Sequence, residues 1–301
     1  MLQTSTLPRL RELSAREEAI SIERLTNIDE AEVLQFLSQR PIHTVAMMSM
    51  IRDNGIVSSL NRGTFYGCRD LNGQLEGVAL VGHATLMETV SDRALAALAQ
   101  VARECPSTHM IMGEKERVAD FWSHYSEAGR RQRLACREWL FELTWPVEAR
   151  EPVLGLRQAT QSELELVMPI QAELAFAESG VNPMEVDEEG FRQRCLRRIE
   201  QGRTWVVVED GQLVFKADVI SKTPEVVYLE GIWLREDHRN KNAGIRFMSE
   251  LMRRLLEDTR SICLLVNETN QLAQGFYRKC GFHFRATYET IFLPRKEQVQ
   301  N

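Results

Sequence analysis

The sequence lacks several patterns that define common protein classes. No apolar run approaches the length of a membrane span, and residues 1–18 lack the hydrophobic core of a secretory signal. The six cysteines form no C-x-x-C pair and have no histidine spacing typical of a zinc site. We therefore expect a cytoplasmic protein with reduced thiols, no metal and no membrane partner.

Two further absences narrow the kind of ligand. The P-loop pattern G-x-x-x-x-G-K-[ST] does not occur, which argues against a nucleoside triphosphate site of that type. The formal net charge of -6 is opposite to the basic balance typical of nucleic-acid-binding domains. We expect no nucleic-acid partner, so a local group of cations in this chain indicates a specific anion site.

The length of the chain and a break in its hydrophobic pattern favour two domains. With 301 residues and 44% hydrophobic residues, the chain is long enough for two hydrophobic cores. The periodicity breaks at residues 144–152, where two prolines bracket a charged segment. The sequence therefore predicts a flexible arm at 1–20, a first domain at 21–148 and a second domain at 149–301.

Helical spacing and strand-like runs alternate in both halves. In the first half the pattern predicts helices and strands at 29–37, 44–51, 64–69, 75–81, 84–88, 91–103, 109–112, 118–125 and 138–143. In the second half it predicts them at 154–159, 161–178, 187–201, 204–209, 213–220, 226–234, 245–256, 262–266 and 271–279, with a final strand pair within 282–293. The fold class is α/β (α+β), with a mixed, mostly antiparallel sheet flanked by helices in each half.

The most informative stretch is the strand at 226–234, the turn that follows it and the next helix. The turn contains Arg239, Lys241 and a run of Asn and Gly residues, and Arg246 lies in the first turns of the helix. The first N–H groups of a helix have no internal partner and attract anions. The pattern indicates a phosphate site, and the alternative is an ordinary strand-to-helix turn with solvated charges.

This turn resembles a signature of the GNAT acyltransferases. Arg239-Asn-Lys-Asn-Ala-Gly244 is similar to their Arg/Gln-x-x-Gly-x-Gly/Ala motif, with Asn242 in place of the first glycine. A second resemblance lies in Asn267, Asn270, Ala273, Tyr277 and the pair Gly281-Phe282, which follow at the family's spacing. The similarity covers residues 154–293. The whole chain resembles two-domain GNAT proteins whose N-terminal half is a diverged GNAT-like domain.

The resemblance implies an acetyl-CoA-dependent N-acetyltransferase with acetyl-CoA as co-substrate. The acceptor would be an amine of a small molecule or a peptide, and the resemblance leaves a homodimer open. The implied cofactor-binding residues are Ile232, Trp233, Leu234, Arg239, Asn240, Lys241, Asn242, Ala243, Gly244, Asn267, Asn270, Ala273 and Phe276. The alternative is a CoA-binding sensor or regulatory module with a GNAT fold and no turnover.

Two side chains are candidates for the catalytic proton transfers. Tyr277 lies one position from the stripe Leu272, Phe276 and Cys280, and its resemblance to the family tyrosine implies a general acid. Glu230 shares strand parity with Ile232 and is a candidate base for the amine proton. Tyr277 could instead only anchor its helix, and Glu230 could be the structural partner of an arginine or lie on a wet face.

The backbone of residues 230–234 offers a further group for the reaction. Its N–H groups would polarise a thioester carbonyl if Gly231 forms a bulge or splay. In the same half, we expect Lys216 to be a structural or surface charge. The corresponding segment of the first half has no glycine and carries Glu88 and Asp92 near a helix start, so we expect that half to bind no CoA.

Overall fold

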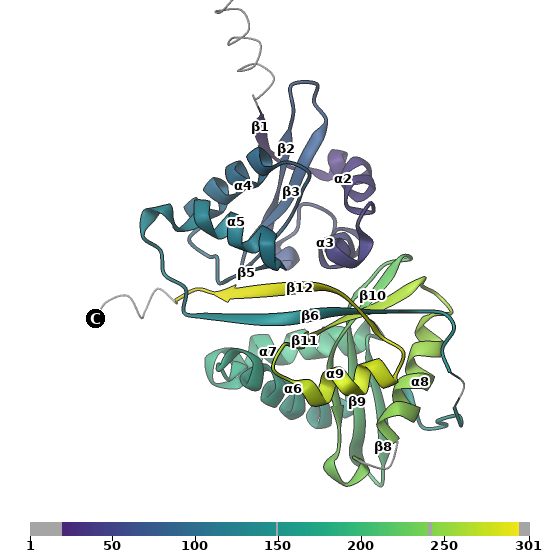
Figure 1. Ribbon diagram of the computed structural model, residues 1–301. Coiled ribbons are helices and arrows are strands. Elements are labelled where there is room, and N and C mark those ends of the chain that lie inside the picture. The colour runs from purple at the N-terminus through teal and green to yellow at the C-terminus, as the bar shows by residue number, and fades with distance from the viewer. Residues whose placement is uncertain (1–19, 149, 240–242, 295–301) are drawn as a thin grey trace, which may run out of the picture. The chain divides into compact units, whose positions relative to one another are not determined.

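The computed structural model describes residues 20–148, 150–239 and 243–294 (Figure 1). The expected arm at 1–20 therefore lies outside the described residues, except for Ile20. The chain divides into two compact units: Met1–Trp139 together with Ala286–Asn301 form unit 1, and Leu140–Arg285 form unit 2.

Unit 1 is a mixed sheet with helices on both faces (Figure 1). Its strands are β1 (Ser21–Arg24), β2 (Gly63–Arg69), β3 (Leu75–Gly82), β4 (Ala84–Thr89), β5 (Met110–Glu114) and the second part of β12 (His283–Phe292). Its helices are α2 (Glu30–Leu37), α3 (Pro41–Asn54), α4 (Asp92–Glu104) and α5 (Lys115–Tyr125). The strand order is β1-β2-β3-β4-β5-β12, with parallel pairing between β4 and β5 and antiparallel pairing elsewhere.

The apolar run in β3 explains how unit 1 holds two layers of helices. Val78 and Leu80 pack in a cluster with residues of α2 and α3. Ala79 and Val81 pack in a second cluster with residues of α4 and α5. Successive side chains of a strand point to opposite faces, so a strand covered on both faces is apolar at consecutive positions.

Unit 2 repeats this arrangement. Its strands are β6 (Leu134–Thr144, which begins in unit 1), β7 (Arg157–Gln158), β8 (Thr204–Glu209), β9 (Gln212–Lys222), β10 (Val226–Leu234) and β11 (Ser261–Asn267). Its helices are α6 (Leu164–Ser179), α7 (Pro183–Glu200), α8 (Ala243–Leu255) and α9 (Gln271–Lys279). The order is β6-β11-β10-β9-β8-β7, with β10 and β11 parallel and β7 to β10 antiparallel. The expected mixed α/β fold is confirmed.

Three details differ from the sequence expectations. The units divide inside β6 and β12 rather than near residue 148, because each of these strands supplies residues to both units. The expected strand pair within 282–293 is wrong: residues 283–292 form one strand, and they contain no Gly, Pro, Asn or Asp that would favour a turn. The expected strand at 154–159 is reduced to Arg157–Gln158.

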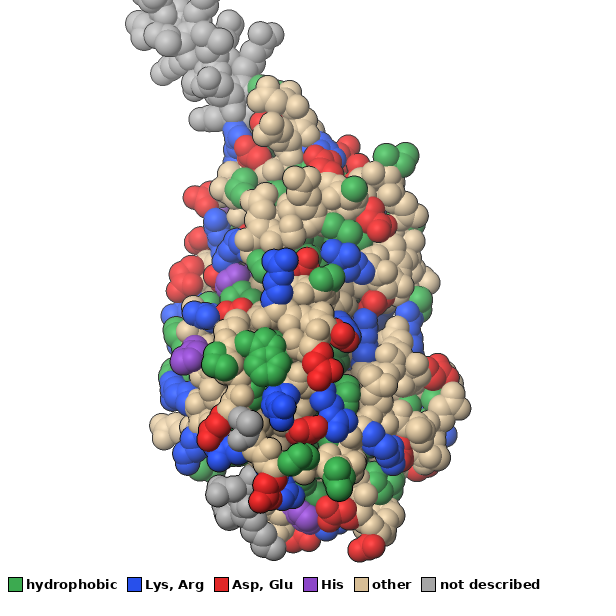
Figure 2. Space-filling view, turned by 90° about the vertical axis from the view of Figure 1, so that its right-hand side faces the viewer, with side chains coloured by type: hydrophobic (Ala, Val, Ile, Leu, Met, Phe, Trp, Pro, Cys, Tyr) green, Lys and Arg blue, Asp and Glu red, His purple; other side chains and the backbone are tan. Residues whose placement is uncertain are grey.

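The described surface carries charges of both signs, as the composition indicates. On the face drawn in Figure 2, Lys and Arg side chains are interspersed with Asp and Glu side chains. None of the described helices combines the length and the apolar character that a membrane crossing requires. The described residues contain no group of three or more His, Cys, Asp or Glu side chains placed to hold a metal. The cysteines are free thiols.

Candidate acyl-CoA site

The candidate site lies where the parallel strands β10 and β11 part. Their described pairing runs from Val226 opposite Ser261 to Leu229 opposite Leu264. β10 continues to Leu234 beyond the last described pair. Over this second part β10 is paired with β9 on its other edge, and no described residue pairs with the edge toward β11, which we call the open edge. Such an edge presents N–H groups to a ligand.

A β-bulge occurs at this point of β10. Glu230 pairs with Asp218 and Trp233 pairs with Lys216, so β10 has one residue more than β9 between the two pairs. Gly231 lies in the bulge with φ of 59°, in the left-handed region that favours glycine. The condition set for the backbone of residues 230–234, a bulge at Gly231, is therefore present.

The bulge overturns the expected parity of Glu230. Residues opposite each other in a sheet share a face, so Glu230 and Trp233 lie on the same face as Asp218 and Lys216. Trp233 packs against the apolar cluster of α6 and α7. The expectation that Glu230 and Ile232 share a face is therefore wrong, because the extra residue reverses the alternation between them.

The start of α8 lies close to β10 and α9. A Cβ atom added to Gly244 would lie 3.2 Å from the Leu234 Cδ2 atom and 3.2 Å from the Phe276 Cε2 atom. Glycine at this position permits the close approach of the three elements. The structure thus brings together Leu234, Gly244 and Phe276, which the sequence places far apart.

A pocket of about 750 Å³ lies at the N-terminus of α8. Its lining contains three cationic side chains and one carboxylate; the residues are Arg150, Glu151, His238, Ala243, Ile245, Arg246 and Lys279. The guanidinium of Arg246 lies 3.5 Å from the Glu151 carboxylate, and its buried Nε has no hydrogen-bond partner among the described residues. Cations beside a helix N-terminus provide the chemistry of a phosphate site.

The cationic turn before α8 is described only in part. Arg239 donates from Nε to the Leu234 carbonyl at 3.0 Å, and its side chain is half exposed. This bond ties the turn to the end of β10. Asn240, Lys241 and Asn242 lie outside the described residues, so their expected contacts with a cofactor stay predictions.

Asn267 and Asn270 organise the connection between β11 and α9. The Asn267 side chain accepts bonds from the backbone N–H and the hydroxyl of Thr269, at 2.9 and 2.7 Å. The Asn270 side chain caps α9 by accepting from the Ala273 N–H at 3.0 Å. Both residues have local roles that explain their positions, and their contact with a cofactor stays a prediction.

Tyr277 lies in an aromatic environment on α9. Its ring centroid is 5.2 Å from that of Phe276 and 5.8 Å from that of Phe282, both in edge-to-face geometry. Burial raises the pKa of Tyr277, so the phenol keeps its proton at neutral pH. The expected stripe is wrong at Leu272, which is 90% exposed, because the buried Gln274 takes the inner position and donates to two backbone carbonyls of the preceding turn.

A buried polar cluster surrounds Glu230. Burial raises the pKa of this carboxyl, although the neighbouring Arg198 favours its charged form. Asp218, opposite Glu230, accepts from Arg198 at 3.0 Å and from Lys216 at 2.6 Å. Burial alone would raise the pKa of Asp218, but the two cations hold it below its usual value. A raised pKa brings Glu230 nearer to the range of a general base at neutral pH.

The sequence contains a signal for this cluster. Lys216 and Asp218 alternate within an otherwise apolar strand, and both side chains are fully buried. Alternate residues of a strand share a face, so two opposite charges at this spacing predict a buried pair. The expectation of a structural charge at Lys216 is met by a buried ion pair rather than a surface one.

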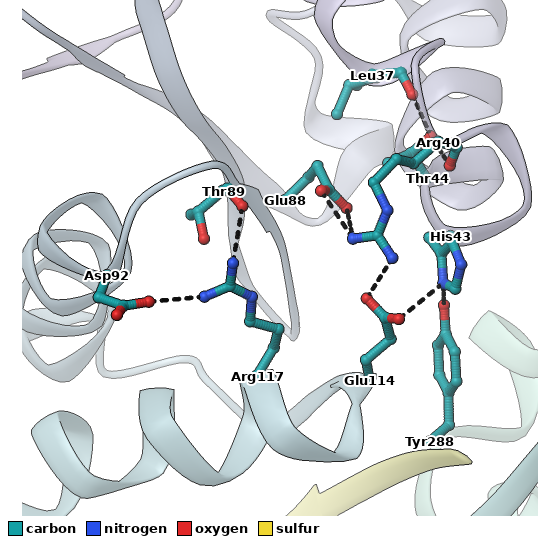
Figure 3. A network of polar contacts seen from close by, with 10 residues as sticks. All are labelled: Leu37, Arg40, His43, Thr44, Glu88, Thr89, Asp92, Glu114, Arg117 and Tyr288. Carbon is teal, nitrogen blue, oxygen red and sulfur yellow. Dashed lines mark hydrogen bonds and ion pairs between the residues drawn. The ribbon is translucent and has the colours of Figure 1, made fainter. Parts of the chain in front are cut away.

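Unit 1 has a corresponding point of divergence between β4 and β5. Their described pairing runs from Ala84 opposite Met110 to Leu86 opposite Met112. Beyond it, the Arg40 guanidinium lies between two carboxylates, 3.0 Å from Glu88 and 2.6 Å from Glu114 (Figure 3). The remaining cavity of about 40 Å³ holds little more than a water molecule.

Sequence and structure comparisons identify the class of the domain. Residues 169–282 match the acetyltransferase (GNAT) family. No curated protein sequence matches the chain. The matched residues lie within unit 2, which therefore carries the GNAT match.

Solved structures share the fold over most of the chain. A Drosophila protein is similar with a TM-score of 0.66 and 11% identity, covering 91% of this chain and 98% of its own. A GCN5-related N-acetyltransferase from Sphaerobacter thermophilus has a TM-score of 0.57 and 14% identity, covering 91% and 96%. A tandem GNAT protein from the clavulanic acid biosynthesis pathway has a TM-score of 0.53 and 15% identity, covering 90% and 98%.

Proposed function

We propose that unit 2 is an acetyl-CoA-dependent N-acetyltransferase that acts on an amine of a small molecule or a peptide. The observation that carries this proposal is the open edge of β10 beyond Leu229, with the bulge at Gly231 beside it. The cationic pocket at the start of α8 supports the assignment of the CoA phosphates to this end of the sheet.

The proposed reaction is direct attack by a neutral amine on the thioester carbonyl carbon. The C–N bond forms and the C–S bond breaks, so charge develops on the carbonyl oxygen and then on the sulfur. The N–H groups on the open edge of β10 stabilise the oxygen, and Tyr277 gives its proton to the departing thiolate. Glu230 takes the proton that the amine loses, directly or through water.

Retention of the Tyr277 proton and the raised pKa of Glu230 suit these roles. A phenol that stays protonated at neutral pH is an available acid, and a carboxylate with a raised pKa is a stronger base than a free one. The competing function, a CoA sensor without turnover, would use the same pocket and would leave acetyl-CoA intact.

A mass-resolved screen of amines, peptides and small metabolites with acetyl-CoA tests the proposal. We expect at least one acceptor to gain an acetyl group with release of one CoA thiol per product. Binding of acetyl-CoA without transfer to any acceptor class would favour the sensor, and the absence of binding would reject both functions.

A further inference from the structure

The ammonium group of Lys216 is fully enclosed by acceptors. The side chain has no exposed surface. Its Nζ donates to Gln171 Oε1 at 2.6 Å, to Asp218 Oδ2 at 2.6 Å and to the Gly231 carbonyl at 3.1 Å. A lysine ammonium has three N–H donors, so all of them are used. Lys216 therefore has a defined position within the sheet rather than the freedom of a surface lysine.

The partners of this ammonium are themselves held in place. Asp218 also accepts from the Arg198 guanidinium at 3.0 Å and from the Thr204 hydroxyl at 2.8 Å. Gln171 comes from α6 and is buried. A buried charge is tolerated when it is paired and fully hydrogen-bonded, and such a network fixes the geometry of its members.

The third acceptor links the network to the bulge of β10. A Cβ atom on Gly231 would lie 2.8 Å from Gln171 Oε1 and 2.9 Å from Lys216 Nζ, so the glycine backbone lies directly against both groups. In a planar trans peptide the C=O and the next N–H point in opposite directions. With the Gly231 carbonyl held toward Lys216, the Ile232 N–H points away from it.

Strand alternation gives the same direction for this N–H. The Arg235 N–H donates to the Val214 carbonyl on β9 at 2.9 Å, and Trp233 is in register with Lys216 on β9. Because N–H groups of a strand alternate between its two edges, the Ile232 N–H faces the other edge. That edge is the one along which pairing with β11 ends at Leu229.

We propose that Lys216 is a positioning residue: it fixes the Gly231–Ile232 peptide so that the Ile232 N–H is aimed at the thioester carbonyl of acetyl-CoA. This inference rests on the proposed function. It gives the buried ion pair of unit 2 a purpose beyond stability, because a peptide in a bulge has no regular ladder to set its orientation. Lys216 itself does not contact the reacting atoms.

Infrared difference spectroscopy of bound acetyl-CoA, labelled with carbon-13 at the carbonyl, tests this role without a known acceptor. In the wild-type protein we expect the carbonyl band at lower frequency than in free acetyl-CoA, because a fixed N–H donor polarises the bond. In Lys216→Met most of this shift should be lost while calorimetry shows acetyl-CoA bound with an affinity within about threefold of wild type, a change of under about 1 kcal/mol.

A matched control and a second variant complete the test. Lys222→Met, at the exposed end of the same strand, should keep the wild-type band. If Lys216→Met does not fold, Gln171→Met removes one acceptor of the ammonium without changing any charge, and part of the shift should be lost. Once an acceptor is known, Lys216→Met should lower kcat by about 10- to 100-fold with little change in KM for acetyl-CoA.

The outcomes separate this inference from the proposed function. Failure of the wild-type protein to bind acetyl-CoA would reject the function itself. Binding with an unshifted carbonyl in the wild type, or a band unchanged in Lys216→Met or in Gln171→Met, would overturn the positioning role and leave the acyl-CoA site intact.

Discussion

In both units two parallel strands diverge at the corresponding point of the sheet, but different groups lie beyond the divergence. In unit 2, β10 continues past its last described pair with β11 and carries a bulge and an open edge. In unit 1, the carboxylates beyond the last described pair of β4 and β5 are joined by the Arg40 guanidinium. The same topology thus leaves room for a ligand in one unit and is filled by a side chain of the chain itself in the other.

The helices that follow β10 and β4 also differ in the charge near their N-termini. The start of α8 in unit 2 adjoins a pocket with Arg150, Arg246 and Lys279. The start of α4 in unit 1 carries Asp92, and the neighbouring Glu88 is buried. Negative charge near a helix N-terminus occupies the place that a phosphate would take. We therefore expect an anionic ligand in unit 2 and none in unit 1, because the charged residues at the two divergences differ.

The largest effect that separates the two units is expected for Tyr277→Phe. The variant keeps the ring contacts with Phe276 and Phe282 and loses the proton donor, so turnover should fall by roughly 10²-fold or more with acetyl-CoA binding retained. The matched control is Tyr288→Phe in unit 1, whose hydroxyl bonds to His43 and which should leave turnover unchanged. Steady-state kinetics with the best acceptor would assign Tyr277 to packing alone if Tyr277→Phe kept wild-type kcat.

A smaller effect is expected for Gly244→Val, which fills the junction of α8, β10 and α9. The new Cβ would lie 3.2 Å from atoms of Leu234 and Phe276, and the added methyl groups would push α8 away from β10. We expect the Kd for acetyl-CoA to rise at least about tenfold, or about 1.4 kcal/mol. Gly275→Ala on α9 is the control, since nothing lies within 4 Å of its Cβ position. Equal calorimetric affinities of the two variants would remove this junction from the site.

The smallest effect concerns stability and arises in unit 1. Arg40→Met leaves the buried Glu88 without its guanidinium partner, and we expect a loss of about 1–2 kcal/mol at neutral pH, reduced by the partial exposure of Arg40. Burial raises the pKa of Glu88, so the Glu88 carboxyl binds a proton more tightly in the folded variant than in the unfolded chain. Its stability deficit should therefore shrink as the pH falls and Glu88 becomes neutral.

Urea unfolding of wild type and Arg40→Met at several pH values measures this linkage. Arg103→Met is the control, because its ion pair with Glu127 is exposed and should contribute little. A deficit of Arg40→Met that stays constant with pH would mean that Glu88 does not depend on Arg40.

Periodicity and turn chemistry predicted most of the fold. β8 and α9 match their expected bounds, and Ser91 was placed correctly at the start of α4, where its hydroxyl accepts from the Ala94 N–H. Where the structure has β12, the sequence predicts two strands within one domain, because no local pattern reveals that a strand supplies residues to two units. Such pairings are set by contacts distant in sequence.

The sequence located some of the residues that the structure brings together, and their roles stay predictions. The approach of Leu234, Gly244 and Phe276 agrees with the residues that the family resemblance singled out. The prediction that Glu230 and Ile232 share a face was wrong, because a bulge reverses the alternation of side chains. In the sequence, only Gly231 indicated where a bulge could lie. The hydrogen-bond network around Lys216 could not be predicted from the sequence, because its members come from five separate elements, α6, α7, β8, β9 and β10.

The central claim, one acyl-CoA site that belongs to unit 2, is tested most directly by calorimetric titration of the whole chain with acetyl-CoA. We predict a stoichiometry of one per chain. In Arg239→Glu, which reverses the charge of the turn tied to β10, we predict strongly weakened binding. Arg40→Met, which removes the corresponding cation of unit 1, should leave both the stoichiometry and the affinity of the remaining site unchanged. A stoichiometry of two, or a single site lost in Arg40→Met and kept in Arg239→Glu, would contradict the account.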